Sequence, residues 1–380
     1  MFNRNAKVAC VIVFSLVVSG CAGMRNDSSP LPQTPQDQTS GAAIDTQVQT
    51  LDEAIAPAGV QALWIANGTN VLEFTPYLYK TGVVNNAPYR TNNSPAFGAP
   101  QGVQFDKNGN LWVIDGGTVA GGGKIPPALD EFTPAQLKAL TLHPKPLPFR
   151  QIKYSGFKFI QQAVFDANGN FWVTDNGANA VYKYDPAQLA AGGANVIPDA
   201  TLTSSPAFTG PLGIAFGANG NLWIANNGTT TLFEFNRAAL PLSGKHVLHP
   251  NVVLSDNGHG SIQGPWALVF DSAGNLWSSN ANAPDTVVAF ANANLKTSGK
   301  PTPSITIQPT IDGGFNTLSS PNGIAFNSSG DLNAVSSLAP FGLAQYNPFF
   351  HSGKDIPYRL IVGNKTTLNA PAGNEYGPVY

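Results

Sequence analysis

The chain has few charged residues and few residues that carry covalent or metal chemistry. Charged side chains make up 11% of its 380 residues, against roughly 25% in an average soluble domain, and it has 5 histidines and 2 cysteines. No basic stripe is present, so nucleic acid is not expected as a partner. Neither a serine nor a cysteine nucleophile motif appears, so nothing in the sequence points to catalysis through a covalent intermediate.

Long apolar runs are also missing. Arg4 and Lys7 precede an apolar run at 8–18, which ends shortly before Cys21. This layout is typical of a secretory signal, because a membrane-spanning helix needs about 20 apolar residues. The phrase Val-Ser-Gly-Cys at 18–21 resembles the bacterial lipobox, whose cysteine is acylated and becomes the mature N-terminus. We therefore predict a signal peptide at 1–20 and lipidation of Cys21; an ordinary cleavage site that happens to contain cysteine is the alternative.

Acyl chains would hold the protein on a membrane surface without spanning the membrane. Ala22 rather than Asp follows the cysteine, which is the pattern of Gram-negative lipoproteins released to the outer membrane. We expect the protein in the cell envelope, facing the periplasm or the cell surface. Residues 21–56 are rich in Pro, Gln, Ser and Thr and predict a flexible tether. Cys10 would leave with the signal peptide, so no disulfide framework is expected.

One short phrase, in contrast, returns six times along the chain. Its fullest form is Phe-Asp-Lys-Asn-Gly-Asn-Leu-Trp, and a weak copy has Asn in place of the final Trp. The steps between successive Trp or Asn positions range from 48 to 60 residues, a period typical of propeller blades rather than helical repeats. The copies lie at 105–112, 165–172, 216–223, 270–277 and 326–333, with a partial copy at 63–64.

Each copy predicts a β-hairpin, because Asn and Gly tolerate the positive φ of tight turns between strands. A third strand with alternating polarity follows, as at 129–132. A one-turn helix with a Thr cap and a Pro is expected at 133–137, and a Pro-flanked outer strand at 304–307. The sequence therefore predicts an all-β fold, a six-bladed β-propeller with four-stranded blades, at 57–380.

The two ends of the predicted propeller complement each other. The first repeat lacks its innermost strand, whereas the last residues, Tyr-Gly-Pro-Val-Tyr at 376–380, resemble the innermost-strand phrase at 212–216. We therefore predict that the last five residues pair beside Leu63 and Trp64 and close the ring. A closed ring leaves no long unpaired edge.

Propeller topology also predicts where a ligand would bind. The first two strands of a blade are antiparallel, so the start of one and the end of the other meet at the mouth of the central channel, where polar groups converge. The strand-start positions are Gln101, Gln161, Leu212, Trp266, Asn322 and Tyr376, and the strand-end positions are Asn67, Asp115, Asp175, Asn226, Asn280 and Ser336. We predict ligand contacts for Gln101, Asp115, Gln161, Asp175, Asn226, Trp266, Asn280 and Asn322. The alternative for the strand-end residues is that Asp and Asn bond to the amides of their own turns.

Trp266 differs from the other five tryptophans, which occupy the repeat position that packs between blades. It stands at a strand-start position instead. An aromatic ring at the mouth of a channel either stacks on a sugar ring or caps the channel with apolar bulk, and the sequence favours neither interpretation.

The phrases at 211–216 and 220–226 resemble NHL repeats and the related gluconolactonase and senescence-marker-protein propellers, over roughly residues 58–380. In the lactonase family this resemblance implies a divalent ion in the channel, held by oxygen ligands from a Glu, an Asn and an Asp phrase. Ser-Pro-Asn-Gly at 320–323 matches the Asn phrase, and the segment that begins at Glu375 partly resembles the Glu phrase, with one residue inserted. The Asp phrase has no match.

Virginiamycin-type lyases have a similar repeat style but rely on a histidine in the channel with a nearby glutamate. The five histidines of this chain are all expected in outer or connecting segments. They are His143, His246, His249, His259 and His351.

Two functions from different classes follow. The favoured one is a non-catalytic, lipid-anchored binding or scaffold module, a monomer without cofactor that binds a glycan, a peptide or a protein at its channel face. The alternative is a metal-dependent hydrolase or lactonase that uses Asn322, with Asp115, Asp175 or Glu375 in place of the missing ligands. That alternative requires a divalent cation.

Overall fold

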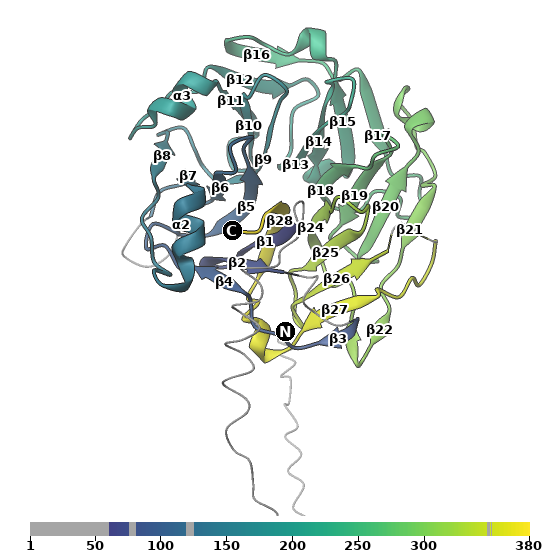
Figure 1. Ribbon diagram of the computed structural model, residues 1–380. Helices are drawn as coiled ribbons and strands as arrows, with labels where there is room; N and C mark the ends of the chain where they lie inside the picture. Colours follow the sequence, from purple (N-terminus) through teal and green to yellow (C-terminus); the bar gives the residue numbers. More distant parts are fainter. Residues whose placement is uncertain (1–60, 76–80, 119–124, 348–349, 351) are drawn as a thin grey trace, which may run out of the picture. The chain divides into compact units, whose positions relative to one another are not determined.

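A computed structural model describes residues 61–75, 81–118, 125–347, 350 and 352–380. Six sheets, each with four antiparallel strands and two of them with a fifth strand, surround a common centre and form a six-bladed β-propeller (Figure 1), which confirms the predicted fold. Within the part of the chain that is described, no helix is long and apolar enough to cross a membrane. The predicted signal peptide, Cys21 and the predicted tether lie outside the described residues.

From the centre outward, the strands of the first three blades follow one plan. Blade 1 contains β28 (Pro371–Pro378), β1 (Gln61–Asn67), β2 (Asn70–Phe74) and β4 (Arg90–Asn92). Blade 2 contains β5 (Pro100–Phe105), β6 (Leu111–Asp115), β7 (Ala128–Phe132) and β8 (Arg150–Lys153). Blade 3 contains β9 (Ile160–Phe165), β10 (Phe171–Asp175), β11 (Ala180–Tyr184) and β12 (Ala200–Ser204).

The last three blades repeat this order. Blade 4 contains β13 (Pro211–Phe216), β14 (Leu222–Asn226), β15 (Thr231–Phe235) and β17 (Val252–Ser255). Blade 5 contains β18 (Pro265–Phe270), β19 (Leu276–Asn280), β20 (Thr286–Phe290) and β21 (Ile305–Ile307). Blade 6 contains β24 (Pro321–Phe326), β25 (Leu332–Ser336), β26 (Gly342–Tyr346) and β27 (Arg359–Val362).

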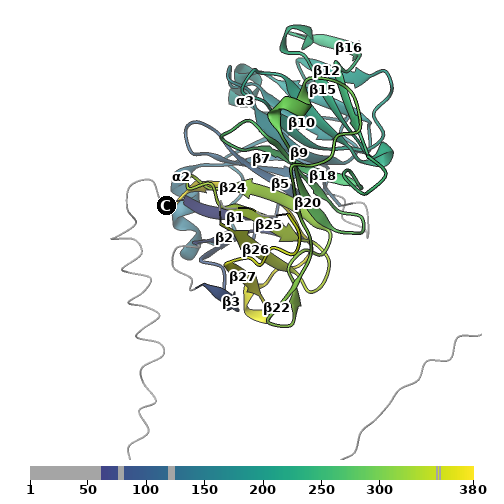
Figure 2. The same ribbon diagram turned by 90° about the vertical axis from the view of Figure 1, so that its right-hand side faces the viewer.

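Additional strands and short helices lie at the outer rim of the propeller. Parallel fifth strands extend two blades: β16 (Gly244–Leu248) beside β12, and β3 (Gly82–Val84) beside β27. The short helices α2 (Pro134–Lys138) and α3 (Pro186–Ala191) begin with capping boxes and a Pro, as predicted for 133–137. β16 and α3 lie at the outer edge of blade 3 in both views (Figures 1 and 2). A small hairpin joins β22 (Ile311–Asp312) and β23 (Phe315–Asn316).

The repeated phrase forms the turn between the first two strands of a blade. In blade 2 one carboxylate oxygen of Asp106 accepts hydrogen bonds from the backbone N–H groups of Asn108 and Asn110, at 2.8 and 2.9 Å. Gly109 follows with φ +80°, a value that favours glycine. Asp166 and Asp271 make the same bonds in blades 3 and 5. The recurrence of the phrase therefore reflects one turn geometry.

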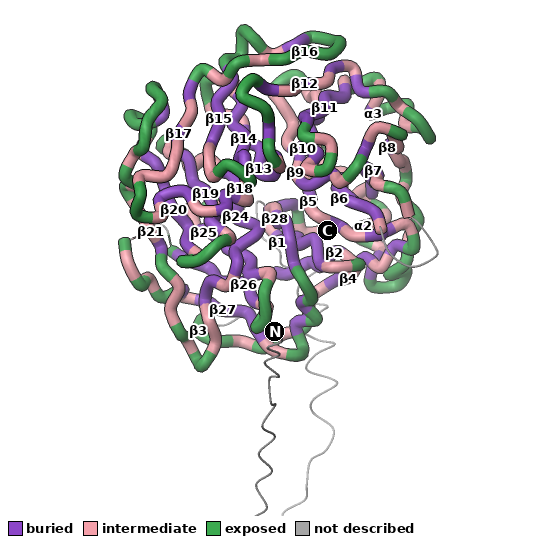
Figure 3. The backbone as a smooth tube through the Cα atoms, turned by 180° about the vertical axis from the view of Figure 1, so that it is seen from behind, coloured by how far each residue is buried: buried purple, intermediate pink, exposed green. Residues whose placement is uncertain are grey.

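The Trp of the phrase packs between blades. All five repeat tryptophans are at most 2% exposed, inside the buried zone that Figure 3 shows along the middle strands. Trp64 lies 5.9 Å, centroid to centroid, from Phe105 of the next blade in an edge-to-face contact, and Trp277 lies 5.5 Å from Phe326. In blade 6 the amide of Asn333 instead donates a hydrogen bond to the hydroxyl of Tyr376 in blade 1. A hydrogen bond thus replaces the aromatic contact at this junction.

The C-terminal strand closes the ring, as predicted. β28 is the innermost strand of blade 1 and pairs with β1, with Tyr376 opposite Leu63 and Glu375 opposite Trp64. The predicted register was wrong, because the strand begins at Pro371 and its strand-start residue is Ala372, not Tyr376. Ala-Gly at 372–373 and Tyr-Gly at 376–377 fit the same pattern, and a slip of four residues leaves every side chain on the same face.

Candidate functional site in the central channel

The six innermost strands enclose a cavity of about 280 Å³. Glycines set its width, because they allow neighbouring inner strands to approach closely. A Cβ at Gly102 would lie 2.9 Å from the carbonyl oxygen of Gln161, and one at Gly373 would lie 2.8 Å from that of Gln101. Cβ atoms do not tolerate such distances, so glycine is required where these blades meet.

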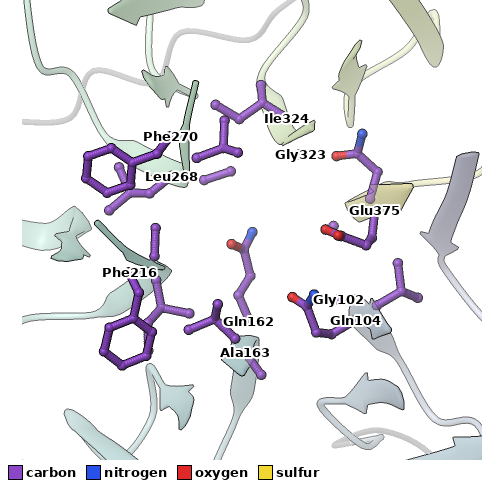
Figure 4. Close-up of a pocket in the computed structure, with 18 residues that line it drawn as sticks. Gly102, Gln104, Gln162, Ala163, Phe216, Leu268, Phe270, Gly323, Ile324 and Glu375 are labelled. Atoms are coloured by element: carbon purple, nitrogen blue, oxygen red, sulfur yellow. The ribbon is translucent and has the colours of Figure 1, made fainter. Parts of the chain in front are cut away.

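The channel has a polar wall and an apolar wall. The polar wall consists of Gln104 from β5, Gln162 from β9, and Asn374 and Glu375 from β28, all in blades 1 to 3. Figure 4 shows Gln104, Gln162 and Glu375 pointing toward one another, with Phe216, Leu268 and Phe270 on the opposite side. The apolar wall, these three residues with Ile324, comes from blades 4 to 6.

Pairing with the second strands shows how unusual the polar residues are. Glu375 lies opposite Trp64, as Ala215 lies opposite Trp223 in blade 4 and Val269 opposite Trp277 in blade 5. At this register position Gln104 and Glu375 are the polar exceptions, and they belong to adjacent blades. One register position earlier, Asn374 stands where the other blades carry Val103, Ala163, Ile214, Leu268 or Ile324.

Glu375 is the one residue among the 18 lining the cavity whose side chain can carry a charge. Glu375 keeps part of its surface open to the channel, yet the loss of solvation there raises the pKa of its carboxyl to about 7, and a hydrogen bond with the Gln104 side chain opposes this rise. Gln162 reaches from blade 3 across the channel, where its Nε2 donates to the carbonyl oxygen of Asn322 in blade 6 at 3.4 Å. Asn374 is 7% exposed, and among the described residues neither atom of its amide has a hydrogen-bond partner.

The raised pKa of Glu375 predicts a specific dependence of stability on pH. The folded state holds the proton more tightly than the unfolded state, so stability falls as pH rises from about 4.5 to about 7. Glu375→Gln removes this dependence. The free energy of unfolding of the variant, relative to that of the original protein, should therefore rise by about 1–3 kcal/mol as the pH goes from about 4.5 to about 7. Urea unfolding of both proteins at several pH values measures the difference. Parallel stability curves would contradict the burial of this carboxyl group.

The predicted strand-end residues are buried and bonded to the segments that precede the inner strands. In Asp115 the carboxylate oxygens accept from the N–H groups of Gly98 and Ala99 at 2.6 and 2.7 Å, and burial raises its pKa. The same arrangement recurs at the other strand ends, where Asp175 accepts from Lys158 and Phe159, Asn226 from Thr209, and Asn280 from Gln263. Bonds to amides of the residue's own turn occur at Asp115, from Gly117, and at Asp175, from Ala178. None of the four residues lines the cavity. A ligand contact at any of them stays a prediction.

The predicted strand-start residues lie one register position outside the glycine layer. Gln161 is 2% exposed and Asn322 is 8% exposed, whereas Gln101 is half-buried. The side-chain oxygen of Asn322 accepts a hydrogen bond from the hydroxyl of Ser320 at 3.4 Å. Trp266 is partly exposed, unlike the five buried tryptophans.

This difference in burial predicts unequal costs for removing two tryptophans of blade 5. Trp277→Ala leaves a cavity between blades and should lower the free energy of unfolding by about 3–5 kcal/mol. Trp266→Ala removes a partly exposed ring and should cost about 1 kcal/mol or less. Denaturant unfolding compares the two variants directly. Equal losses would show that Trp266 is a packing residue rather than an available ring at the mouth of the channel.

The histidines lie in outer and connecting segments, as predicted, except that His351 falls outside the described residues. His246 lies in β16, where its ring bonds to the carbonyl oxygen of Ser243, and the ring of His249 bonds to that of Ser205. No group of three or more His, Cys, Asp or Glu side chains able to hold a metal ion occurs among the described residues.

Sequence reasoning missed Gln104, Gln162 and Asn374 as channel residues and considered Glu375 only as a substitute metal ligand. The available signal was a set of polar residues at register positions where other blades carry glycine or aliphatic side chains. A correct register for β28 is needed to use that signal.

No family model and no curated protein matches the chain. Among solved structures, the periplasmic gluconolactonase PpgL of Pseudomonas aeruginosa aligns with a TM-score of 0.55 at 14% identity, covering 84% of this chain and 99% of that one. A protein of unknown function from Bacteroides caccae aligns with a TM-score of 0.55 at 9% identity and the same two coverages. Virginiamycin B lyase of Staphylococcus aureus gives a TM-score of 0.39 at 14% identity, covering 67% and 68%. At such identities the likeness is one of fold, that of a β-propeller.

Proposed function

We propose that this protein is a non-catalytic binding module of the cell envelope that takes its ligand at the channel of the propeller. The carrying observation is that the oxygen groups needed by the lactonase alternative are used within the fold. Asp115 and Asp175 accept hydrogen bonds from turn amides, and the side chain of Asn322 accepts from Ser320. Of the three residues considered as replacements for the missing metal ligands, Glu375 is the one that lines the cavity.

The proposed ligand is a glycan, a peptide or a segment of a partner protein, bound by a monomer. Low charge and a polar, uncharged surface suit such ligands. The partly exposed Trp266 beside the strand-start residues offers an aromatic ring to an incoming group, and the polar wall of the channel offers hydrogen bonds.

Metal content and lactone hydrolysis separate this function from the alternative. The full chain, purified in detergent, is expected to hold no equimolar calcium or zinc and to show no chelator-sensitive hydrolysis of lactones. Asn322→Ala and Asn168→Ala form a matched pair, because Asn168 is exposed in a turn far from the cavity lining. Equimolar metal that is lost in Asn322→Ala and kept in Asn168→Ala would establish the lactonase alternative.

We also propose that Cys21 carries the acyl chains that anchor the module to a membrane. Cys21→Ala is expected to abolish incorporation of a labelled fatty acid and to move the protein from the membrane fraction to the soluble fraction. A variant that stays labelled and membrane-bound would contradict this anchor.

A further inference from the structure

We propose that the channel interior binds a primary ammonium group carried on a short apolar body. This inference rests on the proposed binding function and names the chemistry of its ligand. It is argued from the charge, the hydrogen-bond acceptors and the shape of the cavity.

The charge comes from Glu375. Arg90 pairs with Glu73, Arg150 with Glu131 and Lys183 with Asp199, and no described cation pairs with Glu375. The other 17 lining residues are glycines, aliphatic or aromatic residues and amides. A carboxylate enclosed in this way is costly to ionise unless a cation comes to it.

Three amides line the same cavity as the carboxylate. Gln162 uses its amide nitrogen as a donor to Asn322, so its side-chain oxygen is left to accept from the channel. Asn374 has both amide atoms without a hydrogen-bond partner among the described residues, although its side chain is more than nine-tenths buried. An unsatisfied buried amide of this kind indicates a missing partner. Gln104 lies beside Glu375 on the next blade.

These carboxylate and amide oxygens fit an ammonium group better than a divalent cation. A primary ammonium has three N–H donors, which match one carboxylate and two amide oxygens. Calcium takes 6–8 oxygen ligands, usually with more than one carboxylate, and Glu375 is the one carboxylate in the lining.

The opposite wall determines what the ammonium is attached to. Phe216, Leu268, Phe270 and Ile324 present apolar surface on the side away from the carboxylate (Figure 4). A ligand with one charged end and an apolar body buries both kinds of surface at once, whereas a uniformly polar sugar leaves the apolar wall unmatched. A volume of about 280 Å³ lies just below the range of about 300–1,000 Å³ for ligand pockets, so the body is short.

Such a group occurs on free alkylamines and on lysine side chains of peptides. Calorimetric titration of the full chain at a pH above 7 distinguishes them, with n-butylamine, benzylamine and an acetylated, amidated Gly-Lys-Gly peptide as probes. The neutral controls are n-butanol, benzyl alcohol and the same peptide with acetyl-lysine. Glu375→Gln removes the charge with little change in shape, and Asp312→Asn in the outer hairpin is the matched control.

We expect at least one amine probe to bind, with its neutral counterpart at least about tenfold weaker. Glu375→Gln should weaken that probe by a similar factor, and Asp312→Asn should not. The tighter of the free amine and the peptide identifies the source of the ammonium. Thermal unfolding of each variant verifies that it is folded.

The proposal is overturned if no amine binds at millimolar concentration, if the alcohols bind as well as the amines, or if Glu375→Gln leaves amine binding unchanged. Binding of a glycan or a neutral peptide with no response to amines would overturn this inference and leave the proposed binding function standing. Lactone hydrolysis with bound metal would overturn both.

Discussion

Deletion of residues 375–380 is expected to lower the melting temperature by more than about 10 °C. The deletion removes half of β28, including Tyr376, which is 7% exposed and accepts a hydrogen bond from Asn333. It also removes Tyr380, whose hydroxyl donates to the carbonyl oxygen of Gly109 in the next blade. Loss of one large buried aromatic residue costs about 3–5 kcal/mol, and each kcal/mol corresponds to about 2–4 °C in a domain of this size.

The reason for so large an effect is that the deleted segment closes the ring. Without it, β1 presents an unpaired edge next to the channel, and blades 6 and 1 lose their junction. Pro378→Ala is the matched control, because Pro378 is exposed and the rest of the strand stays in place. Circular dichroism melting curves compare the three proteins. A deletion variant that melts like the control would mean that the ring does not depend on this strand.

Arg90→Met is expected to lower the free energy of unfolding by about 3–5 kcal/mol, because it leaves the carboxylate of Glu73 buried without its cation. Arg90 Nη1 lies 3.0 Å from a carboxylate oxygen of Glu73, and both side chains are 0% exposed. Arg90 also donates to the backbone oxygen of Tyr380, so it connects the outer part of blade 1 with the C-terminal strand. Denaturant unfolding measures the loss.

Blade 2 supplies a matched control for this prediction. Glu131 pairs with Arg150 at the same register position, at 2.7 Å, but the Arg150 side chain is 27% exposed. Glu131→Gln leaves the guanidinium of Arg150, which water can solvate, so this variant should cost only about 1 kcal/mol. The double variant Glu73→Leu with Arg90→Met should recover part of the loss, because no unpaired charge remains. Similar losses in Arg90→Met and Glu131→Gln would contradict the role given to burial.

The fold was predictable because one phrase determines one turn. Asp106 or its counterpart accepts hydrogen bonds from two backbone amides, and a glycine adopts positive φ. The same residues therefore recur in each blade that has this turn. The register of β28 was not predictable in the same way. Gly373 and Gly377 both fit the pattern, and the bond between Asn333 and Tyr376, which distinguishes them, joins residues that are distant in the sequence.

The channel was harder to predict than the fold. Asp115 and Asp175 were predicted as ligand contacts because they carry carboxylates. In the structure these carboxylates accept hydrogen bonds from backbone amides that precede the inner strands. Gln104 and Glu375 face each other only because blades 1 and 2 are neighbours in the closed ring. The role of Gln104 depends on Glu375 of the neighbouring blade, and Glu375 lies there because the last strand of the chain, β28, pairs with β1.

The central claim is that Glu375 is an enclosed carboxyl group without a cation of its own, and its titration tests this most directly. Carbon-13 NMR of the side-chain carboxyl, assigned by comparison with Glu375→Gln, should give a pKa of about 7 in the purified, ligand-free protein. A pKa at or below the ordinary value of about 4.5 would contradict the claim, because it would place the carboxyl group in open water or beside a positive charge.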